Sequence, residues 1–476
     1  MLERDLLELV EKIQNYQTEF YDIEVKEAHE GCPKKLYDTI SAFSNQNGGG
    51  ILVFGLKESA NFEVVGVYDP ADLQKKMTEQ CKQMSPIVRP VFTFCKSDDK
   101  IIMAAEIPEI DVTDKPCFYT GKGRLTGSYI RVGDSDEQMT EYEVYSYDAF
   151  RNKYQDDIRL TEKVPFSMLD KNKLDAYVIG LKNKKNRLVT INNDEIYELM
   201  GVTKNNIPTL AGTMMFCKYP QGYFPQFCIT AVVVPGYEIG EVGNMGERFI
   251  DNKRIDGTIP EMLEEAVRFV YKNIAIKTII DRETGQRQDK AEYPMEAVRE
   301  IILNALIHRD YSIHTEGIPI QILLFKNRLE VKSPGGLYGR FRIDQIGKAQ
   351  PDTRNPVIAI MMEDMSLTEN RYSGIPTIRR SMKQFGLKEP VFDDVRNYFF
   401  VTLYNEPVNA TKSEAAGDLV AFCKVPRNRT EIAEYLGLKT NYHAMQKYIL
   451  PLIEKGKLKY TIPDKPKSKN QKFVSE

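Results

Sequence analysis

AVREIILNALIHRDY, residues 297–311, decides the fold of the central part of this chain. Placed on a helix, its apolar residues form a single stripe that a neighbouring sheet or helix can bury. The stripe consists of Val298, Ile301, Ile302 and Ala305. The stretch therefore predicts an amphipathic helix whose other face carries polar side chains.

The polar face of this helix has two interpretations. Residues four apart are neighbours on a helix surface, so Glu296, Glu300, Asn304 and His308 form one adjacent line. Spacing alone favours a solvated face. The alternative is a nucleotide site, because an Asn amide oxygen can hold a hard cation that bridges phosphates. A Glu one turn earlier can orient or deprotonate a water near the terminal phosphate.

Further motifs accompany this stretch in a fixed order. They are EYPMEAVREIILNALIHRDYS at 292–312, RLEVKSPGGL at 328–337, TRNP at 353–356 and RYSGIPTIRRSMKQFGL at 371–387. In this order they resemble the divergent GHKL-type ATP-binding domain of regulators that are often labelled helicase-related or Schlafen AlbA-domain proteins. The resemblance implies an α/β sandwich that binds ATP and Mg²⁺. Helicase action is not expected, because the sequence has no GxxxxGKS/T loop.

The resemblance also implies roles for individual residues. Glu300 becomes the candidate base that orients the attacking water, and Asn304 becomes the candidate Mg²⁺ ligand. Gly335 and Gly336 match the first glycine box, and Gly374 matches the second. Glycine suits these places because backbone without a Cβ can approach a phosphate or an adenine closely. The alternative for the first pair is an ordinary turn.

The first glycine box departs from the classical pattern. Classical members carry there an Asp that reads the adenine amino group, whereas Ser333 and Pro334 stand near that place here. We expect His308, Arg309 and Asp310 at the nucleotide, with Arg309 on a phosphate and Asp310 holding Arg309. ATP binding with at most weak ATPase activity is the expected result.

The N-terminal region contains a strand with alternating side chains. Its sequence, FYDIEVKEA at 20–28, turns Ile23 and Val25 inward and places Glu24 and Lys26 on the other face. An ion pair on a solvated face is the simplest interpretation of Glu24 and Lys26.

Three segments in this region resemble the Schlafen AlbA-type domain. They are EFYDIEVKEA at 19–28, ISAFSNQNGGGILVFGLKE at 40–58 and GSYIRVGDSD at 127–136. The family is usually described as DNA-binding, which makes Lys26 a candidate nucleic-acid contact. Some Schlafens instead use three acids to cut RNA, and by motif these are Glu19, Glu24 and Glu58. A metal-dependent nuclease is therefore an alternative, although Lys57 replaces one acid of the usual turn.

The last part of the chain has a helix-turn-helix pattern. RNRTEIAEYLGLKTNYHAMQKYILPLIEKGKL at 427–458 predicts two helices, the first capped by Thr430. The Lys-rich segment KLKYTIPDKPKSKNQKF at 457–473 predicts a basic wing. The whole resembles a winged helix-turn-helix domain, which lays its second helix in the DNA major groove and its wing on phosphates. The candidate contacts are Asn441, His443, Gln446, Lys447, Lys465, Lys467, Lys469 and Lys472. A solvated tail and a protein–protein module are the alternatives.

These motifs divide the 476 residues, which are too many for one core, into several parts. We expect an α+β multidomain protein. The predicted parts are an AlbA/Schlafen-like α/β domain at 1–150, an α/β connecting region at 151–290, a GHKL-like ATP-binding domain at 291–410, a linker at 411–424 and a winged helix-turn-helix at 425–476.

Composition excludes several classes of protein. With 42% hydrophobic and 28% charged residues and a net charge of -3, the chain is typical of a globular protein. Its seven scattered Cys form no CxxC pair, which predicts reduced thiols in the cytoplasm. No apolar run approaches the roughly 18 residues of a membrane span. No paired Cys/His spacing indicates a structural zinc site.

Three functions remain open from the sequence. The first is an ATP-binding, DNA-binding transcriptional regulator. By analogy with winged regulators, which commonly read paired half-sites, we expect it to form a homo-oligomer. The second is a Schlafen-like metal-dependent nuclease, acting in phage defence, that would cut DNA or RNA. The third is a non-enzymatic assembly protein with a vestigial pocket.

Overall fold

The computed structural model describes residues 1–243, 245–280, 287–339, 343–348, 352–368, 373–395, 397–407, 419–420, 422–436, 444–463 and 471–475. The chain divides into two units. The first contains residues 1–140 and 409–476, and the second contains residues 141–408. Helix α4 (Glu141–Arg151) thus belongs to the second unit, although the predicted N-terminal domain extended to residue 150.

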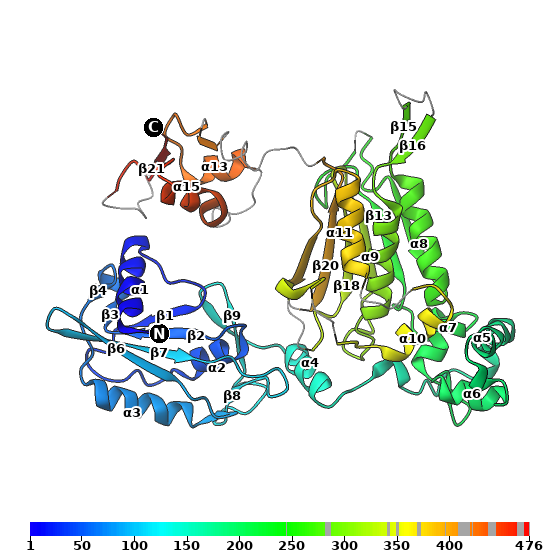
Figure 1. Ribbon diagram of the computed structural model, residues 1–476, viewed down its shortest axis with the longest axis horizontal. Helices are drawn as coiled ribbons and strands as arrows, with labels where there is room; N and C mark the ends of the chain where they lie inside the picture. The colour runs from blue at the N-terminus through cyan, green and yellow to red at the C-terminus, as the bar shows by residue number, and fades with distance from the viewer. Residues whose placement is uncertain are drawn as a thin grey trace. The chain divides into compact units, whose positions relative to one another are not determined.

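A four-stranded sheet forms the centre of the N-terminal part (Figure 1). Its order is β1 (Ile23–Lys26), β2 (Gly50–Phe54), β7 (Lys100–Ile107) and β6 (Val91–Ser97), with β1 and β2 parallel and the other neighbours antiparallel. Helix α1 (Glu3–Tyr16) covers one face, while α2 (Tyr37–Asn45) and α3 (Pro70–Cys81) cover the other. The central strands are continuous apolar runs because both of their faces are buried.

Short antiparallel pairs complete the N-terminal part. They are β3 (Leu56–Lys57) with β4 (Glu63–Val64), β5 (Met84–Ser85) with β8 (Phe118–Tyr119), and β9 (Tyr129–Val132) with β10 (Ser135–Gln138). In the last pair Arg131 lies opposite Asp136. This pairing brings together two charged residues that are important for the N-terminal site.

The C-terminal part of the first unit has a small core of its own. It contains α13 (Arg429–Tyr435), the π-helical turn η7 (Met445–Ile449), α15 (Leu450–Glu454) and the antiparallel pair of β21 (Lys459–Tyr460) and β22 (Phe473–Val474). Pro451 lies in the first turn of α15, where proline is tolerated. The Oδ1 atom of Asn428 accepts from the backbone N–H groups of Thr430 and Glu431, both at 2.9 Å. Asn428 therefore caps α13, and the predicted Thr430 cap is wrong.

A six-stranded mixed sheet forms the centre of the second unit. Its order is β14 (Asp251–Ile255), β13 (Ile229–Val233), β17 (Ile320–Leu324), β18 (Arg328–Pro334), β20 (Tyr398–Tyr404) and β19 (Val391–Val395). Strands β13 and β17 pair in parallel, and the other neighbours are antiparallel. The sheet therefore joins strands of the predicted connecting region, 151–290, with strands of the predicted ATP-binding domain.

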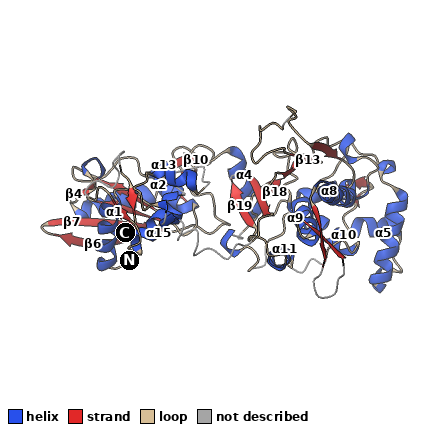
Figure 2. Ribbon diagram, turned by 90° about the horizontal axis from the view of Figure 1, so that it is seen from above, coloured by secondary structure: helices blue, strands red, loops and turns tan. Residues whose placement is uncertain are grey.

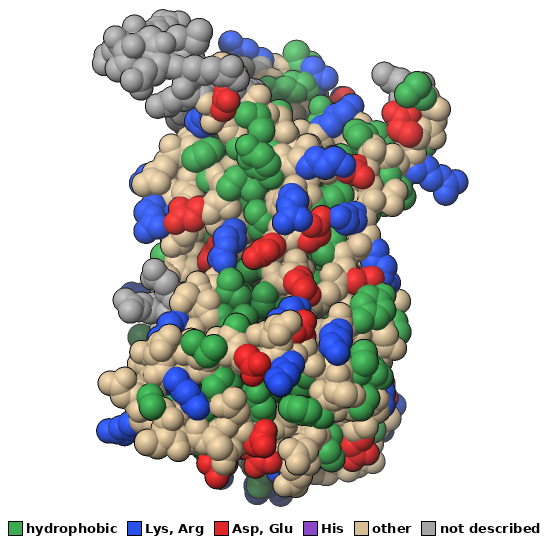
Figure 3. All heavy atoms as spheres, turned by 90° about the vertical axis from the view of Figure 1, so that its right-hand side faces the viewer, with side chains coloured by type: hydrophobic (Ala, Val, Ile, Leu, Met, Phe, Trp, Pro, Cys, Tyr) green, Lys and Arg blue, Asp and Glu red, His purple; other side chains and the backbone are tan. Residues whose placement is uncertain are grey.

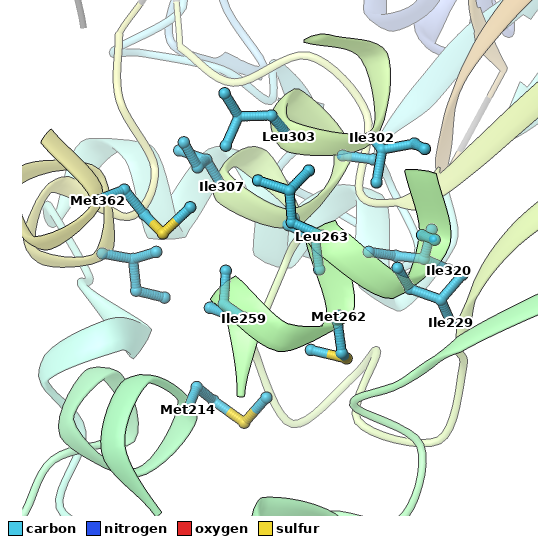
Figure 4. Packing of buried hydrophobic residues seen from close by; sticks show 14 of the residues in the cluster. Met214, Ile229, Ile259, Met262, Leu263, Ile302, Leu303, Ile307, Ile320 and Met362 are labelled. Carbon is cyan, nitrogen blue, oxygen red and sulfur yellow. The ribbon is translucent and has the colours of Figure 1, made fainter. Parts of the chain in front are cut away.

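Three helices lie side by side against this sheet (Figures 1 and 2). They are α8 (Ile259–Asn273), α9 (Met295–His308) and α11 (Gly374–Gln384). A capping box of Thr258 and Glu261 starts α8. Figure 4 shows Leu263 of α8 beside Ile302 of α9 in the buried cluster between the layers. The predicted helix at 297–311 is thus a central packing element.

The remaining elements of the second unit surround these two layers. They are α5 (Lys171–Lys184), α6 (Asn193–Leu199), α7 (Leu210–Phe216), α10 (Pro356–Asp364), the pair of β11 (Thr203–Lys204) and β12 (Ile207–Pro208), and the pair of β15 (Ile276–Ile280) and β16 (Arg287–Ala291). On the face shown in Figure 3, basic and acidic side chains are interspersed among the described residues. The described residues on that face therefore form no extended patch of one charge sign that would attract a charged partner.

Candidate nucleotide pocket and N-terminal ion-pair network

A cavity of about 890 Å³ runs along helix α9, from Glu296 in its first turn to His308 in its last. The turn after β18, the segment before α10 and the start of α11 complete its lining. Small-molecule and cofactor sites occupy roughly 300–1,000 Å³, so the cavity is large enough for a nucleotide. The polar line predicted along the helix therefore faces a cavity.

Glu300 and Asn304 form a bonded pair on the cavity side of α9. The Asn304 Nδ2 group donates to Glu300 Oε1 at 3.2 Å. Burial raises the pKa of the Glu300 carboxyl, and the hydrogen bond from Asn304 partly opposes that shift. The bond uses the nitrogen of the Asn304 amide, not the oxygen that a cation would require. The Asn304 amide oxygen can therefore serve as a ligand for a hard cation, beside a Glu300 carboxyl group whose pKa is raised.

Gly374 lies directly against this pair. A Cβ at position 374 would lie 2.2 Å from Glu300 Oε1 and 3.1 Å from Asn304 Nδ2. Gly374 is the first residue of α11, and the side chain of the preceding Ser373 makes no capping hydrogen bond. The first N–H groups of a helix have no intrahelical partner and favour anions. The absence of a side chain at 374 therefore brings an anion-favouring helix end close to Glu300 and Asn304.

His308 contacts the cavity from the last turn of α9. Its side chain is exposed, but the space that exposes it is the cavity, and protein surrounds the ring. Burial among protein groups, with the nearby charge of Arg354, lowers the pKa of His308 to about 4. The imidazole is therefore neutral at physiological pH, so it offers one hydrogen-bond donor and one acceptor rather than a positive charge.

Arg309 and Asp310 do not have the predicted roles. Arg309 is 1% exposed and donates to the carbonyl oxygens of Thr315 at 3.0 Å and Ile318 at 2.6 Å. Its guanidinium therefore lies in the core and not on a phosphate. The Asp310 carboxylate pairs with Arg354 at 2.5 Å, so the prediction that Asp310 holds Arg309 is also wrong. The i,i+4 spacing rule does not apply to these two residues, because the helix ends at His308.

Side chains from three motifs satisfy the backbone at the end of α9. The last carbonyl groups of a helix have no intrahelical partner, and leaving them buried without one is costly. The bonds are Ser333 Oγ to the Ala305 oxygen (3.0 Å), Tyr311 Oη to the Leu306 oxygen (2.9 Å), and Asn355 Nδ2 to the Ile307 and Arg309 oxygens (2.8 and 2.7 Å). Sequence reasoning missed Tyr311 and Asn355, although both stand in the quoted motifs. Their role is to fix the helix that carries the pocket residues.

Gly335 and Gly336 both line the cavity. Gly335 has a φ of +95°, and a Cβ there would lie 2.6 Å from Asp310 Cβ. The Gly336 carbonyl accepts from Arg354 Nη2 at 3.1 Å. Gly335 thus requires glycine for both its conformation and its surroundings, while Gly336 connects the turn to a buried arginine.

The acids of the N-terminal part belong to an ion-pair network. Arg131, whose side chain is 1% exposed, contacts Glu24 at 2.8 Å and Asp136 at 2.9 Å. Lys26 also pairs with Glu24, as the simplest interpretation of the strand predicted. That pairing neutralises the Lys26 ammonium, which does not support the predicted nucleic-acid contact. Lys57 pairs with Glu27 at 3.1 Å.

Glu19 has the most perturbed carboxyl of this part. Burial raises its pKa to about 7, and the charges of Glu24 and Glu58 add to the shift, while a hydrogen bond from the Val25 N–H opposes it. The three acids are therefore neighbours. Among the described residues, however, no group of three His, Cys, Asp or Glu side chains is arranged to hold a metal. The predicted three-acid metal site is not assembled, because Arg131 and Lys26 already bind Glu24.

Most predicted DNA contacts at the C-terminus fall outside the described residues. These are Asn441, His443, Lys465, Lys467 and Lys469. Gln446 and Lys447 lie in the π-helical turn η7, and their side chains are not described. Lys472 is exposed just before β22, and its backbone N–H donates to Thr461 Oγ1 at 3.1 Å. The described strands β21 and β22 thus pair on either side of the predicted wing.

Family models match three parts of the chain. Residues 19–140 match the model described as "Schlafen, AlbA_2". Residues 317–403 match the model described as "Putative ATP-dependent DNA helicase recG C-terminal". Residues 418–474 match the model described as "Filamentation induced by cAMP protein Fic-like, C-terminal domain". The first two matches indicate nucleic-acid binding and an ATP-related function.

Two solved structures are similar at low levels. The DIP2311 protein from Corynebacterium diphtheriae is 17% identical, with 95% of this chain and 93% of that chain covered and a TM-score of 0.41. The N-terminal domain of a "Putative ATP-dependent DNA Helicase RecG-related Protein" from Nitrosomonas europaea is 28% identical, with 29% of this chain and 94% of that chain covered and a TM-score of 0.23. At these TM-scores neither likeness bears on the fold. No curated protein matches the chain.

The described part of the chain contains no helix that is long and apolar enough to cross a bilayer. The N-terminal motif group lies within the match at 19–140, and the motifs at 328–337, 353–356 and 371–387 lie within the match at 317–403. The helix motif at 292–312 precedes that second match. The chain therefore combines a Schlafen AlbA-type domain with a divergent ATPase-like domain of the RecG C-terminal type.

Proposed function

We propose that this protein is an ATP-binding, DNA-binding transcriptional regulator whose nucleotide site biases DNA binding. One observation carries the nucleotide half of the proposal. The start of α11 at Gly374 lies against the Glu300–Asn304 pair, inside a cavity of about 890 Å³. This place suits a Mg²⁺-bound triphosphate. It combines a helix end that favours anions, an amide oxygen that can bind a cation, and a carboxyl group of raised pKa.

The residues present fit this group in a definite arrangement. The Asn304 amide oxygen would hold Mg²⁺, and the N–H groups at the start of α11 would hold the phosphates. Bound Mg²⁺ supplies charge neutralisation at the phosphates. Glu300 would orient a water near the terminal phosphate and accept its proton, which supports at most a weak ATPase activity. Arg299 and Arg380 add positive charge to the lining.

The other end of the cavity suits an uncharged group such as a base. His308 is neutral there, and the Ser333 hydroxyl donates its proton to the Ala305 oxygen. The lone pairs of the Ser333 oxygen therefore remain as acceptors at a position near which classical GHKL proteins carry an Asp. The GHKL-type sandwich is consistent with helices α8, α9 and α11 on a mixed sheet.

Nucleic-acid binding is assigned to the AlbA-type domain and to the C-terminal segment. The AlbA-type match supports the first assignment. The pairing of β21 with β22 around a Lys-rich segment supports a winged helix-turn-helix for the second. Winged regulators commonly read paired half-sites, which favours a homo-oligomer. All seven cysteines are free thiols, which fits a reducing cytoplasm.

The proposal requires that ATP bind one arrangement of the chain better than another. The test is fluorescence anisotropy with labelled duplex DNA over a salt series, with and without Mg²⁺–ATP. We expect salt-dependent binding whose affinity changes with Mg²⁺–ATP and is lost when residues 425–476 are deleted. If DNA binding depends on salt but does not change with Mg²⁺–ATP, the proposed regulation by ATP is contradicted. If the protein does not bind DNA, the proposed DNA binding is contradicted.

A further inference from the structure

Helix α4 (Glu141–Arg151) is the first helix after the AlbA-type domain, and it packs behind the nucleotide pocket. Two segments of the pocket lining depend on it. They are the turn after β18, with Gly335, Gly336 and Tyr338, and the segment before α10, with Arg354. The contacts with α4 come from opposite ends of the helix.

The first contact is a chain of buried polar groups that starts at Tyr142. The Tyr142 hydroxyl donates to the Asp310 carboxylate. That carboxylate pairs with Arg354 at 2.5 Å, and Arg354 Nη2 donates to the Gly336 oxygen at 3.1 Å. Asp310 is 2% exposed and Arg354 is 8% exposed. Because the chain is buried, water does not replace a member that is removed, and the hydrogen bond which that member made is lost.

The second contact is aromatic and lies at the other end of α4. Phe150 packs edge-on against the ring of Tyr338, with the ring centroids 5.4 Å apart. The Arg354 guanidinium also lies over the Tyr338 ring, 5.0 Å from its centroid. A Cβ at Gly339 would lie 2.7 Å from the Phe150 ring. The turn after β18 is therefore held by α4 as well as by the sheet.

We propose that Tyr142 is a positioning residue of the nucleotide site, and that α4 transmits the occupancy of that site to the AlbA-type domain. The inference rests on the proposed function. A nucleotide in the cavity contacts the same two lining segments that α4 holds. Binding therefore favours one placement of α4, and by linkage anything that favours that placement strengthens nucleotide binding equally.

The chain before Tyr142 is also fixed. Asp136, on β10, accepts from Thr39 Oγ1 at 2.6 Å and pairs with Arg131 at 2.9 Å. Only residues 137–141 separate this anchor from Tyr142. The covalent connection between the Arg131 network and α4 is therefore short.

The test uses the full chain with Tyr142→Phe, and Tyr145→Phe as the control on the same helix. The Tyr145 hydroxyl donates to Asp156 at 3.4 Å, whereas the Tyr142 hydroxyl donates to Asp310. Calorimetry gives the affinity for Mg²⁺–ATP, and anisotropy gives the DNA affinity with and without Mg²⁺–ATP. Phe150→Leu perturbs the second contact without touching the polar chain, and thermal melting checks that each variant is folded.

We expect Tyr142→Phe to weaken Mg²⁺–ATP binding by about 10- to 100-fold, the usual effect of one hydrogen bond to a charged group. We also expect it to remove most of the effect of ATP on DNA affinity, while both ligands still bind. Tyr145→Phe should resemble the wild type. If the wild type binds no nucleotide, the proposed function fails and this inference fails with it. If the wild type shows coupling and Tyr142→Phe keeps it unchanged, the inference alone is overturned.

Discussion

Gly374 lies against the carboxyl group of Glu300, so closely that a Cβ at 374 would come within 2.2 Å of Glu300 Oε1. The two residues belong to different helices, and α11 and α9 are in contact along their sides. This approach is possible only without a side chain at 374. It brings a helix N-terminus, an acid and the Asn304 amide together at one end of the cavity.

Gly374→Ala should therefore impair nucleotide binding more than folding. The Glu300 carboxyl group lies at the end of a flexible side chain, so it can move away from the new methyl group. That movement separates the carboxyl group from Asn304. We expect the affinity for Mg²⁺–ATP to fall by about tenfold or more, as the loss of a charge-assisted contact would cause. Calorimetry on the folded variant measures this.

Gly180→Ala is the matched control for that substitution. Gly180 lies in α5, and a Cβ there would meet no atom within 4 Å. Helix propensity predicts a gain of about 0.5–1 kcal/mol in stability with no change in nucleotide affinity. Equal affinities for ATP in the wild type and Gly374→Ala would show that the contact with Glu300 does not matter for binding.

Asn355→Ala should destabilise the second unit. Its side chain bonds the carbonyl oxygens of both Ile307 and Arg309, and it is fully buried. Two buried acceptors without partners cost about 2–4 kcal/mol in the free energy of unfolding. Urea titration followed by circular dichroism measures the loss. The exposed Asn172→Ala on α5 should change stability little, and a loss below 1 kcal/mol for Asn355→Ala would argue against the capping role.

Asp157 should make stability depend on pH. Its side chain is fully buried and accepts the N–H groups of Val357 and Ile358 at the start of α10, and burial raises its pKa to about 6. The folded state therefore holds a proton that the unfolded state releases near pH 4. Its contribution to stability is present below pH 4 and is lost as the pH rises to 6, by roughly 3 kcal/mol.

The difference between the wild type and Asp157→Asn isolates that contribution from other titrating groups. Melting temperatures at pH 4, 5 and 6 should fall more steeply for the wild type than for the variant. Asp99→Asn, at a fully exposed position, should follow the wild type. Parallel slopes for the wild type and Asp157→Asn would contradict the assignment.

Arg131→Met should destabilise the first unit by about 3–5 kcal/mol, because Glu24 and Asp136 would lose a buried partner. Arg4→Met, at an 80% exposed side chain, is the surface control. Chemical denaturation of both variants measures the difference. If Arg131→Met is as stable as Arg4→Met, the ion-pair network of Arg131, Glu24 and Asp136 does not stabilise the fold.

The sequence predicted the polar line on α9, because i,i+4 spacing holds along a continuous helix. Spacing alone favoured a solvated face for that line, whereas in the structure the line faces a cavity. Glu300, Asn304 and His308 all line the cavity. The rule gave no direction for Arg309 and Asp310, since the chain leaves the helix after His308 and their side chains point to different partners. Such directions depend on a loop path that periodicity does not encode.

The sequence also did not predict which distant segments pair with one another. The parallel pairing of β13 with β17 joins segments on both sides of the predicted boundary at residue 290. The Glu24–Arg131 ion pair joins a strand to a hairpin more than a hundred residues later. Local motifs identified each partner's segment, but only the assembled sheets bring the partners together.

The most direct test of the account is calorimetric titration of ATP into the wild type and Asn304→Ala, with and without Mg²⁺. The account predicts that Mg²⁺ tightens ATP binding to the wild type by about tenfold or more, as a direct metal ligand would require. Asn304→Ala should lose that gain while it keeps weak, Mg²⁺-independent binding. Equal Mg²⁺ dependence in both proteins, or no binding to the wild type, would contradict it.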